Sequence, residues 1–215
     1  NKEILARYLH SLCSRSDKPF ITVNVSTLDE GNPQKKLLGY ESNNKIQEGY
    51  LDNAIEGTLS ITVGAAKETF SRIAPWLEYM GSDVAYCGNV GTGTVMKLMN
   101  NMVLFEIVSA LAEAMAIATR AGVDRNRVFE LLGQGSADSF ALRRHGSFMT
   151  TGEYPADRFP TTYSVKDLNY ALALADQLDV DAAGARLVRD RFSEIVERGL
   201  GHLYSPVVYE LFDEK

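Results

Sequence analysis

The sequence predicts an α/β layer followed by an all-helical domain, and two observations carry this prediction. Before Gly88, short β-branched or apolar runs alternate with helical patterns, which is typical of a largely parallel sheet covered by helices. After Gly88 the patterns are helical throughout. We therefore place the domain boundary near this glycine, with domains at 1–88 and 89–215.

The first domain opens on a helical pattern that is already under way, which suggests that a beginning is missing. Its strands are short runs rich in β-branched or apolar residues, and they are expected at 20–25, 50–54, 58–63 and 83–87. Its helices are expected at 2–14, from a turn at 31–33 to about 47, and at 66–80. Strand and helix thus alternate up to the boundary.

The second domain begins with one long helix over residues 96–121, which contain neither proline nor glycine. Later helices are separated by glycines and loops, and the expected breaks are Gly122, 133–135, 150–162, Asp179 and 199–201. The long helix is expected to connect the two domains.

Composition restricts the possible functions. With 45% hydrophobic and 23% charged residues, the chain resembles an ordinary globular protein. The net charge of −6, with scattered basic residues, argues against a nucleic-acid partner. Cys13 and Cys87 have no metal-site spacing, so we expect reduced, buried thiols and a cytoplasmic location. A signal sequence is not expected, because the N-terminus lacks a basic-then-apolar pattern, and a membrane span is not expected, because charges interrupt the long apolar helix.

The stretch GNVGTGTVMKLMNN, residues 88–101, is the most informative one. Lys97 and Asn101 are four residues apart, so they share a face of the predicted helix. The glycines before them permit tight turns and close approach of a ligand to the backbone. A lysine at the head of a buried helix needs a partner, although its amine could also extend to solvent.

Other local features are less specific. In GQGSADS, residues 133–139, Ser136 or Asp138 is a candidate helix cap. Ser164 is a candidate N-cap of the helix that carries Lys166 and Asp167. The histidines are too far apart in the sequence to support a metal site, a Ser-His-Asp triad has no GxSxG motif, and no phosphate-binding glycine loop is present.

The same stretch resembles the catalytic signature of the β-hydroxyacid dehydrogenases, which include 3-hydroxyisobutyrate dehydrogenase, tartronate semialdehyde reductase and glyoxylate/succinic semialdehyde reductase. The family pattern GxxGxG followed by KxxNN is met by Gly88, Gly91, Gly93, Lys97, Asn100 and Asn101. GTLSITVG at 57–64, EAMAIATRAGVD, GQGSADS, Phe159 and KDL occur in the family's order. The resemblance implies a partial Rossmann-type domain followed by a 6-phosphogluconate-dehydrogenase-like helical domain.

The resemblance also implies an NAD- or NADP-dependent oxidoreductase that interconverts a small β-hydroxyacid and its semialdehyde, acting as a homodimer or homotetramer. Lys97 matches the catalytic lysine, and Asn101 the residue that holds the substrate. Gly93 matches a position beside the substrate. Cofactor contacts are implied for Thr27, Lys166, Phe159 and Asp167. Apolar neighbours would lower the pKa of Lys97 toward neutrality, which suits general acid–base chemistry.

Two departures from the family keep alternatives open. The glycine-rich pyrophosphate loop does not occur in these 215 residues, and the passage at 50–59 lacks the family's Ser-Gly-Gly substrate loop. Either these parts are missing from the sequence given, or the chain is a truncated, non-catalytic helical dimerisation protein. An imine-reductase-like relative is a further alternative, which the lysine argues against.

Overall fold

The computed structural model describes residues 40–42, 45–47, 59–78 and 80–213. The first described elements are β1 (Tyr40–Ser42) and β2 (Lys45–Gln47), an antiparallel pair. The helix predicted from 31–33 to about 47 is therefore wrong at its C-terminal end, where the backbone is extended. The predicted helix at 2–14 and the strands at 20–25 and 50–54 lie outside the described residues.

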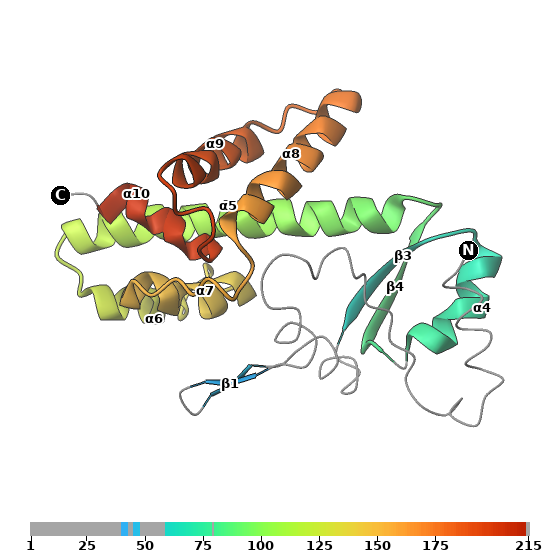
Figure 1. Cartoon of the computed structure of the whole chain (residues 1–215), viewed down its shortest axis with the longest axis horizontal. Coiled ribbons are helices and arrows are strands. Elements are labelled where there is room, and N and C mark those ends of the chain that lie inside the picture. Colours follow the sequence, from blue (N-terminus) through green and yellow to red (C-terminus); the bar gives the residue numbers. More distant parts are fainter. Residues whose placement is uncertain (1–39, 43–44, 48–58, 79, 214–215) are drawn as a thin grey trace. The chain divides into compact units, whose positions relative to one another are not determined.

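The next elements form a β-α-β unit, coloured cyan to green in Figure 1. Strand β3 (Ser60–Gly64) pairs in parallel with β4 (Asp83–Gly88), and the connection between them contains α4 (Lys67–Leu77). All three elements lie where the sequence predicted them, within a few residues. A parallel pair requires a crossover connection, and α4 is that crossover. The α/β part of the predicted fold class is thus confirmed.

The rest of the chain is helical, beginning with α5 (Thr92–Arg120), the long green helix of Figure 1. Gly122, with a φ of +96°, follows it, a backbone angle that side-chain-bearing residues rarely adopt. The later elements are η2 (Arg125–Arg127), α6 (Val128–Leu132), α7 (Phe140–Thr151), α8 (Thr161–Gln177), α9 (Ala183–Glu197), η3 (Ser205–Tyr209) and α10 (Glu210–Asp213).

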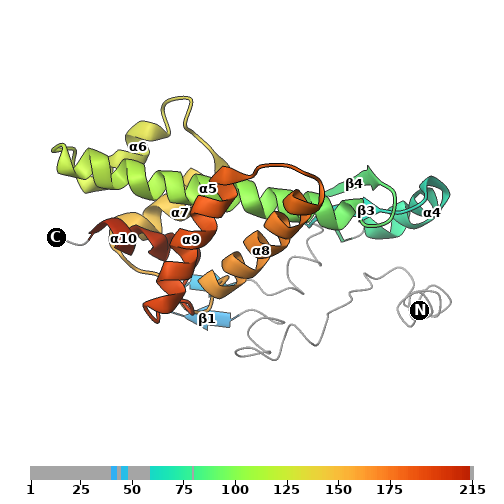
Figure 2. The same cartoon turned by 90° about the horizontal axis from the view of Figure 1, so that it is seen from above.

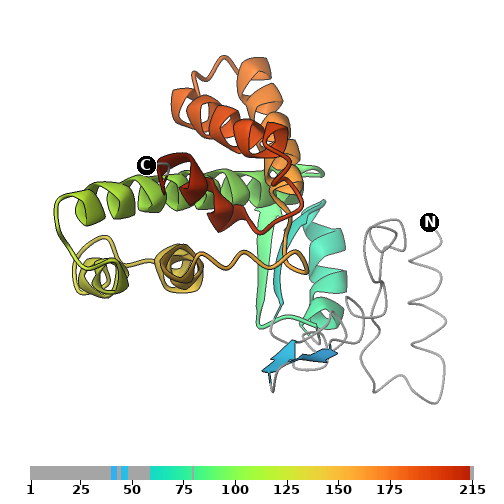
Figure 3. The same ribbon diagram turned by 60° about the vertical axis from the view of Figure 1, so that its left-hand side comes forward.

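Helix α5 is the centre of the helical part. Helices α8 and α9 lie side by side on one side of it, and α6 and α7 lie on the other (Figures 1 and 3). The core side chains come from all of these helices and from η3; Val108, Met115, Leu168, Phe192 and Val207 are fully buried. By length and composition α5 could cross a membrane, but the central helix of a soluble protein passes the same test.

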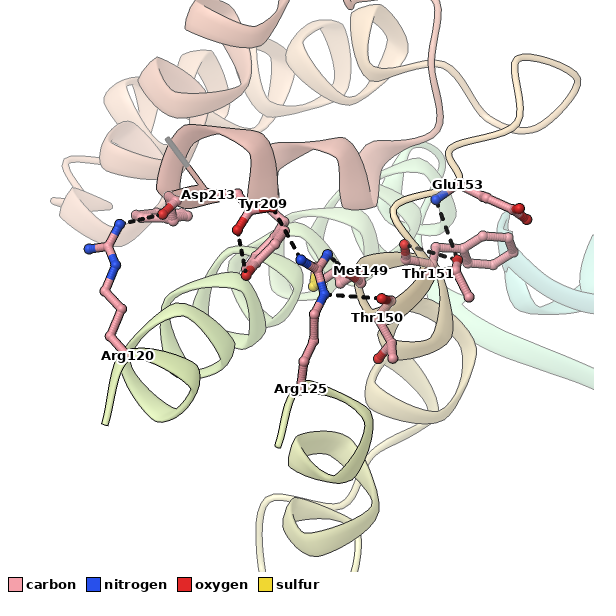
Figure 4. Close-up of polar contacts among 10 residues, drawn as sticks. Arg120, Arg125, Met149, Thr150, Thr151, Glu153, Tyr209 and Asp213 are labelled. Carbon is pink, nitrogen blue, oxygen red and sulfur yellow. Dashed lines mark hydrogen bonds and ion pairs between the residues drawn. The ribbon is translucent and has the colours of Figure 1, made fainter. Parts of the chain in front are cut away.

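Polar contacts fix the C-terminal segment to the helices before it, as Figure 4 shows. The Arg125 guanidinium donates to the carbonyl oxygens of Met149 (2.6 Å) and Thr150 (3.0 Å), which α7 leaves free at its end. It also contacts the Asp213 carboxylate at 3.2 Å and lies over the Tyr209 ring. One side chain therefore joins the end of α7 to η3 and α10.

The chain divides into two compact units, residues 1–96 and 97–215, and the division falls inside α5. The sequence placed this boundary near Gly88, eight residues earlier. The helix also starts earlier than predicted, at Thr92 instead of Met96. Gly93, which sequence reasoning placed in a turn, is therefore a helical residue.

Candidate active site

The two residues singled out on α5 face one buried carboxylate within the helical unit. The Asn101 side-chain nitrogen Nδ2 donates a hydrogen bond of 2.7 Å to Asp167 Oδ2. The Lys97 ammonium lies 3.9 Å from the same oxygen. Asp167 comes from α8, which Figure 2 shows beside α5. The shared face expected from the spacing of Lys97 and Asn101 is therefore present.

Asp167 holds a second cation as well. The Lys166 ammonium lies 3.6 Å from Asp167 Oδ1, so both carboxylate oxygens have partners. The Asp167 side chain is only 4% exposed, and a buried carboxylate is tolerated when it is paired and hydrogen-bonded. Two ammonium groups around one carboxylate leave a net positive charge, which suits an anionic ligand.

The setting of Lys97 differs from the sequence-based expectation. Its side chain is 63% exposed, and that of Lys166 is 51% exposed. The burial among apolar neighbours that we expected for the Lys97 amine is not found, because only the Asp167 side of the pair is covered. The partner expected for this lysine is present, and its amine extends to solvent from there.

The amide of Asn101 is held in one orientation. Its nitrogen donates to Asp167, and its oxygen accepts from the Asn100 side chain at 3.3 Å. Since a carboxylate only accepts, the amide nitrogen must face Asp167, which leaves one N–H of Asn101 for another acceptor. The role of Asn100 was not predicted; the Asn-Asn pair in the KxxNN pattern was the available signal.

Aromatic side chains stand beside this polar group. The Phe159 ring, half-exposed in the loop before α8, stacks on Phe105 with ring centroids 6.2 Å apart and meets Tyr163 edge-on at 5.6 Å. The Lys166 ammonium lies 4.9 Å from the centre of the Tyr163 ring. Phe159 therefore packs against the core through Phe105 and contacts Tyr163, the ring that the Lys166 ammonium approaches.

Two predicted site residues are not part of this group. Thr27 lies outside the described residues. Gly93 packs against strand β3 within the first unit: Thr62 Oγ1 donates to the Gly93 carbonyl oxygen at 3.0 Å, and a Cβ at Gly93 would lie 2.7 Å from the Thr62 carbonyl oxygen. Close packing explains this glycine, and a substrate contact at it stays a prediction.

The predicted caps need correction. Helix α7 begins with Ser139 as its N-cap, whose hydroxyl accepts from the Leu142 amide at 3.0 Å, whereas Asp138 forms an ion pair with Arg143. Helix α8 begins with Pro160 as its N-cap, so Ser164 lies inside its first turn. In both places the helix starts within four residues of the expected cap, and at α8 backbone carbonyls of Gly201 and Leu203 take the place of a capping side chain.

Residues 91–209, more than half of the chain, match the family model described as the NAD-binding domain of NADP-dependent 3-hydroxyisobutyrate dehydrogenase. Residues 1–63 match a different model, the Sigma-54 interaction domain. The two matched segments do not overlap. Thr27 lies in the second of these matches, so the N-terminal quarter of the chain has a resemblance that sequence reasoning did not find.

Curated relatives agree with the first match. Glyoxylate/succinic semialdehyde reductase 1 of Arabidopsis thaliana is 29% identical over 73% of this chain and 54% of its own length. The 3-hydroxyisobutyrate dehydrogenase of Pseudomonas aeruginosa is 33% identical over 67% of this chain and 51% of its own length. The chain thus spans about half the length of the curated relatives it matches.

Solved structures share the fold. A 3-hydroxyisobutyrate dehydrogenase from Salmonella typhimurium superposes with a TM-score of 0.68 at 22% identity, covering 74% of this chain and 56% of that chain. The Mycobacterium tuberculosis enzyme, solved with L-serine, gives 0.67 at 24% identity, covering 75% and 57%. At these identities the likeness establishes the fold: a partial Rossmann-type domain followed by an all-helical domain.

Proposed function

This chain belongs to the family of NADP-dependent 3-hydroxyisobutyrate dehydrogenases, and we propose that it carries the substrate-side half of an oxidoreductase that interconverts a small β-hydroxyacid and its semialdehyde. The observation that carries the proposal is the placement of Lys97 and Asn101 on one buried carboxylate, Asp167. Relatives named as semialdehyde reductases and hydroxyacid dehydrogenases support the reaction class.

Lys97 supplies the proton in this reaction. In the reductive direction a hydride adds to the carbonyl carbon, and the Lys97 ammonium gives a proton to the carbonyl oxygen, so that C=O becomes CH–OH. In the oxidative direction the neutral amine takes that proton back. Asp167 holds the ammonium end of Lys97, and the free N–H of Asn101 is available to hold the substrate oxygen.

NAD or NADP, when bound, supplies or accepts the hydride. The helical unit offers two groups to the nicotinamide end: the exposed Lys166 ammonium and the half-exposed Phe159 ring. The 215 residues contain no GxGxxG loop, so they offer no glycine-rich backbone amides to the cofactor phosphates. The residues present therefore fit the nicotinamide end of the cofactor and not its phosphates.

The first test is a fluorescence titration of NADH and NADPH, followed by semialdehyde reduction with the Lys97→Ala variant. Loss of the proton donor should lower the rate by about 10²–10⁴-fold while cofactor affinity changes less than twofold. Lys67→Ala, an exposed lysine on α4, is the matched control and should keep the full rate. A Lys97→Ala variant with wild-type rate would refute the role of this residue.

A second assignment concerns residues 1–63, because these match the Sigma-54 interaction domain. We propose that this segment derives from such a domain, and that the dinucleotide-binding part of the chain begins near β3, not at residue 1 as the sequence patterns suggested. Thr27→Ala should then leave the Kd for NADPH unchanged. A tenfold rise in that Kd would restore residues 1–88 as a single dinucleotide-binding domain.

Assembly and location are separate proposals. We propose a homodimer or homotetramer in the cytoplasm that acts on a small carboxylate. Sedimentation velocity at several protein concentrations tests the oligomeric state, and a single concentration-independent monomer species would exclude it.

A further inference from the structure

The position of helix α8, which carries Lys166 and Asp167, is set by contacts at its first turn. The Thr161 amide and hydroxyl both donate to the Leu203 carbonyl oxygen at 2.9 Å, and the Thr162 amide donates to the Gly201 carbonyl oxygen at 3.0 Å. The first amides of a helix have no partner within it, so the segment 201–203 acts as the cap of α8. Asp167 follows only six residues after Thr161.

The cap is held in turn by a buried pair of side chains. Tyr204, next to the cap, places its hydroxyl 2.9 Å from His145 Nε2, and His145 Nδ1 lies 2.9 Å from the Ala141 carbonyl oxygen. A carbonyl oxygen only accepts, so Nδ1 carries the hydrogen and Nε2 accepts from Tyr204 when the ring is neutral. His145 lies on α7 and is 3% exposed.

A second proton on His145 would be unfavourable at this place. It would put a charge inside the core, and the Tyr204 hydroxyl would lose Nε2 as the acceptor of its own hydrogen. The charged groups that act on the ring are Arg144, on the same helix, and Arg158, whose guanidinium lies over the rings of Phe148 and Tyr204. Both are cations. Burial lowers the pKa of His145 below its usual 6.5, against the opposing effect of the Ala141 carbonyl, and the two arginines lower it further.

We propose that His145 is a positioning residue for the candidate active site: in its neutral form it fixes Tyr204 and the 201–203 cap, and these fix α8 so that Asp167 meets Lys97 and Asn101. Protonation of His145 releases the cap and displaces Asp167. The site is therefore formed at neutral pH and opened by acid. The effect on catalysis rests on the proposed function, whereas the effect on α8 does not.

The direction of the pH effect follows from the lowered pKa. Well above 6.5, the ordinary pKa of an exposed histidine, the ring is neutral whether the cap is closed or open, so capping is constant. Between 6.5 and the lower pKa of the closed form, only the open form takes up the proton. Opening then becomes more favourable by about tenfold for each pH unit of acidification.

Hydrogen exchange of the full chain, followed by mass spectrometry from pH 5.0 to 8.5, tests this in peptides covering 158–172. After correction for the intrinsic exchange rate, wild-type protection should be constant above pH 6.5 and fall by up to tenfold per unit below it. Peptides from the core of α5, around 105–116, serve as the reference. His145→Gln keeps an acceptor for Tyr204 and does not titrate, so its profile should be flat.

Two further variants test whether the Tyr204 hydroxyl and His145, and not another histidine, hold the cap. Tyr204→Phe removes the hydroxyl, and its 158–172 peptides should lose protection at every pH. His202→Gln changes an exposed histidine two residues from Tyr204 and should keep the wild-type profile. A His145→Gln profile with the wild-type inflection, wild-type protection in Tyr204→Phe, or equal loss in the α5 reference would each overturn the proposal. None of these readouts depends on turnover, so failure of the Lys97 test is distinguished from failure here.

Discussion

The β3–α4–β4 part and the helical unit are built from similar proportions of apolar residues but differ in how they bury them. Helix α4 has no buried residue, and its Trp76 is 48% exposed. Helices α5, α8 and α9 surround fully buried side chains such as Met115 and Phe192. Among the described residues, the short parallel pair and its one helix bury few side chains, Ala65 and Met80 among them, whereas the helices around α5 enclose a core.

The difference matters for the site. Lys97, Asn101, Lys166 and Asp167 all belong to the unit 97–215, whose described residues form the hydrophobic core. A buried carboxylate must keep its partners at hydrogen-bond distance, and this requires backbones that packing holds in place. The β3–α4–β4 part, among its described residues, offers no comparable support. We infer that the site's geometry depends on helical packing.

A pair of aromatic substitutions, one in each part, tests this contrast most strongly. Phe192→Ala should lower the free energy of unfolding by about 3–5 kcal/mol, because the ring is fully buried against Phe105. Trp76→Ala should cost roughly 1 kcal/mol or less, because half of that ring is already in water. Urea unfolding followed by far-UV circular dichroism measures both losses. Tryptophan fluorescence is unsuitable, because Trp76 is the single tryptophan and one of the variants removes it. Equal losses would contradict the contrast between the two parts.

The β3–α4–β4 part does contain one tight contact, which a glycine substitution should reveal. Gly93→Ala would bring a Cβ to 2.7 Å from the Thr62 carbonyl oxygen and 2.8 Å from the Gly64 nitrogen, both of them backbone atoms. We expect a loss of about 2–3 kcal/mol. Gly135→Ala meets nothing nearer than 3.7 Å and should be close to neutral in the same urea titration. A neutral Gly93→Ala would show that α5 can shift away from β3.

Polar contacts within the helical unit should matter less than its packing. Arg191 donates to the buried Ser109 hydroxyl at 2.8 Å and pairs with Glu113, so Arg191→Ala should cost about 1–2 kcal/mol. Arg127 pairs with Glu130 in solvent, so Arg127→Ala should lower the free energy of unfolding by roughly 0.5 kcal/mol or less. Chemical denaturation at low and high salt measures both losses, and the loss in Arg127→Ala should shrink more at high salt because its ion pair is exposed. If Arg127→Ala cost as much as Arg191→Ala, surface charge would contribute more than we infer.

Much of the fold could be predicted because its signals are local. The lack of proline and glycine over 96–121 predicted α5, and Gly122 predicted its end. The spacing of Lys97 and Asn101 predicted that they share a face. These predictions need only helix geometry, which acts over one turn.

The parts that sequence reasoning missed depend on contacts between distant segments. Asp167 is 66 residues from Asn101, so spacing could not show that it is the common partner of Lys97 and Asn101. The family resemblance placed Asp167 near the site. The start of α8 at Pro160 depends on the backbone of 201–203, which accepts from its first amides. The His145–Tyr204 pair joins residues 59 apart and had no local signal.

Asp167 also determines how substitutions in this site combine. Since Lys97, Asn101 and Lys166 all contact this one carboxylate, removing any of them changes the surroundings of the other two. The energies of such variants should not add, and a change at Asp167 should remove most of the further effect of each partner. The three side chains therefore form one energetic unit with Asp167: loss of the carboxylate removes the shared contact of all three at once.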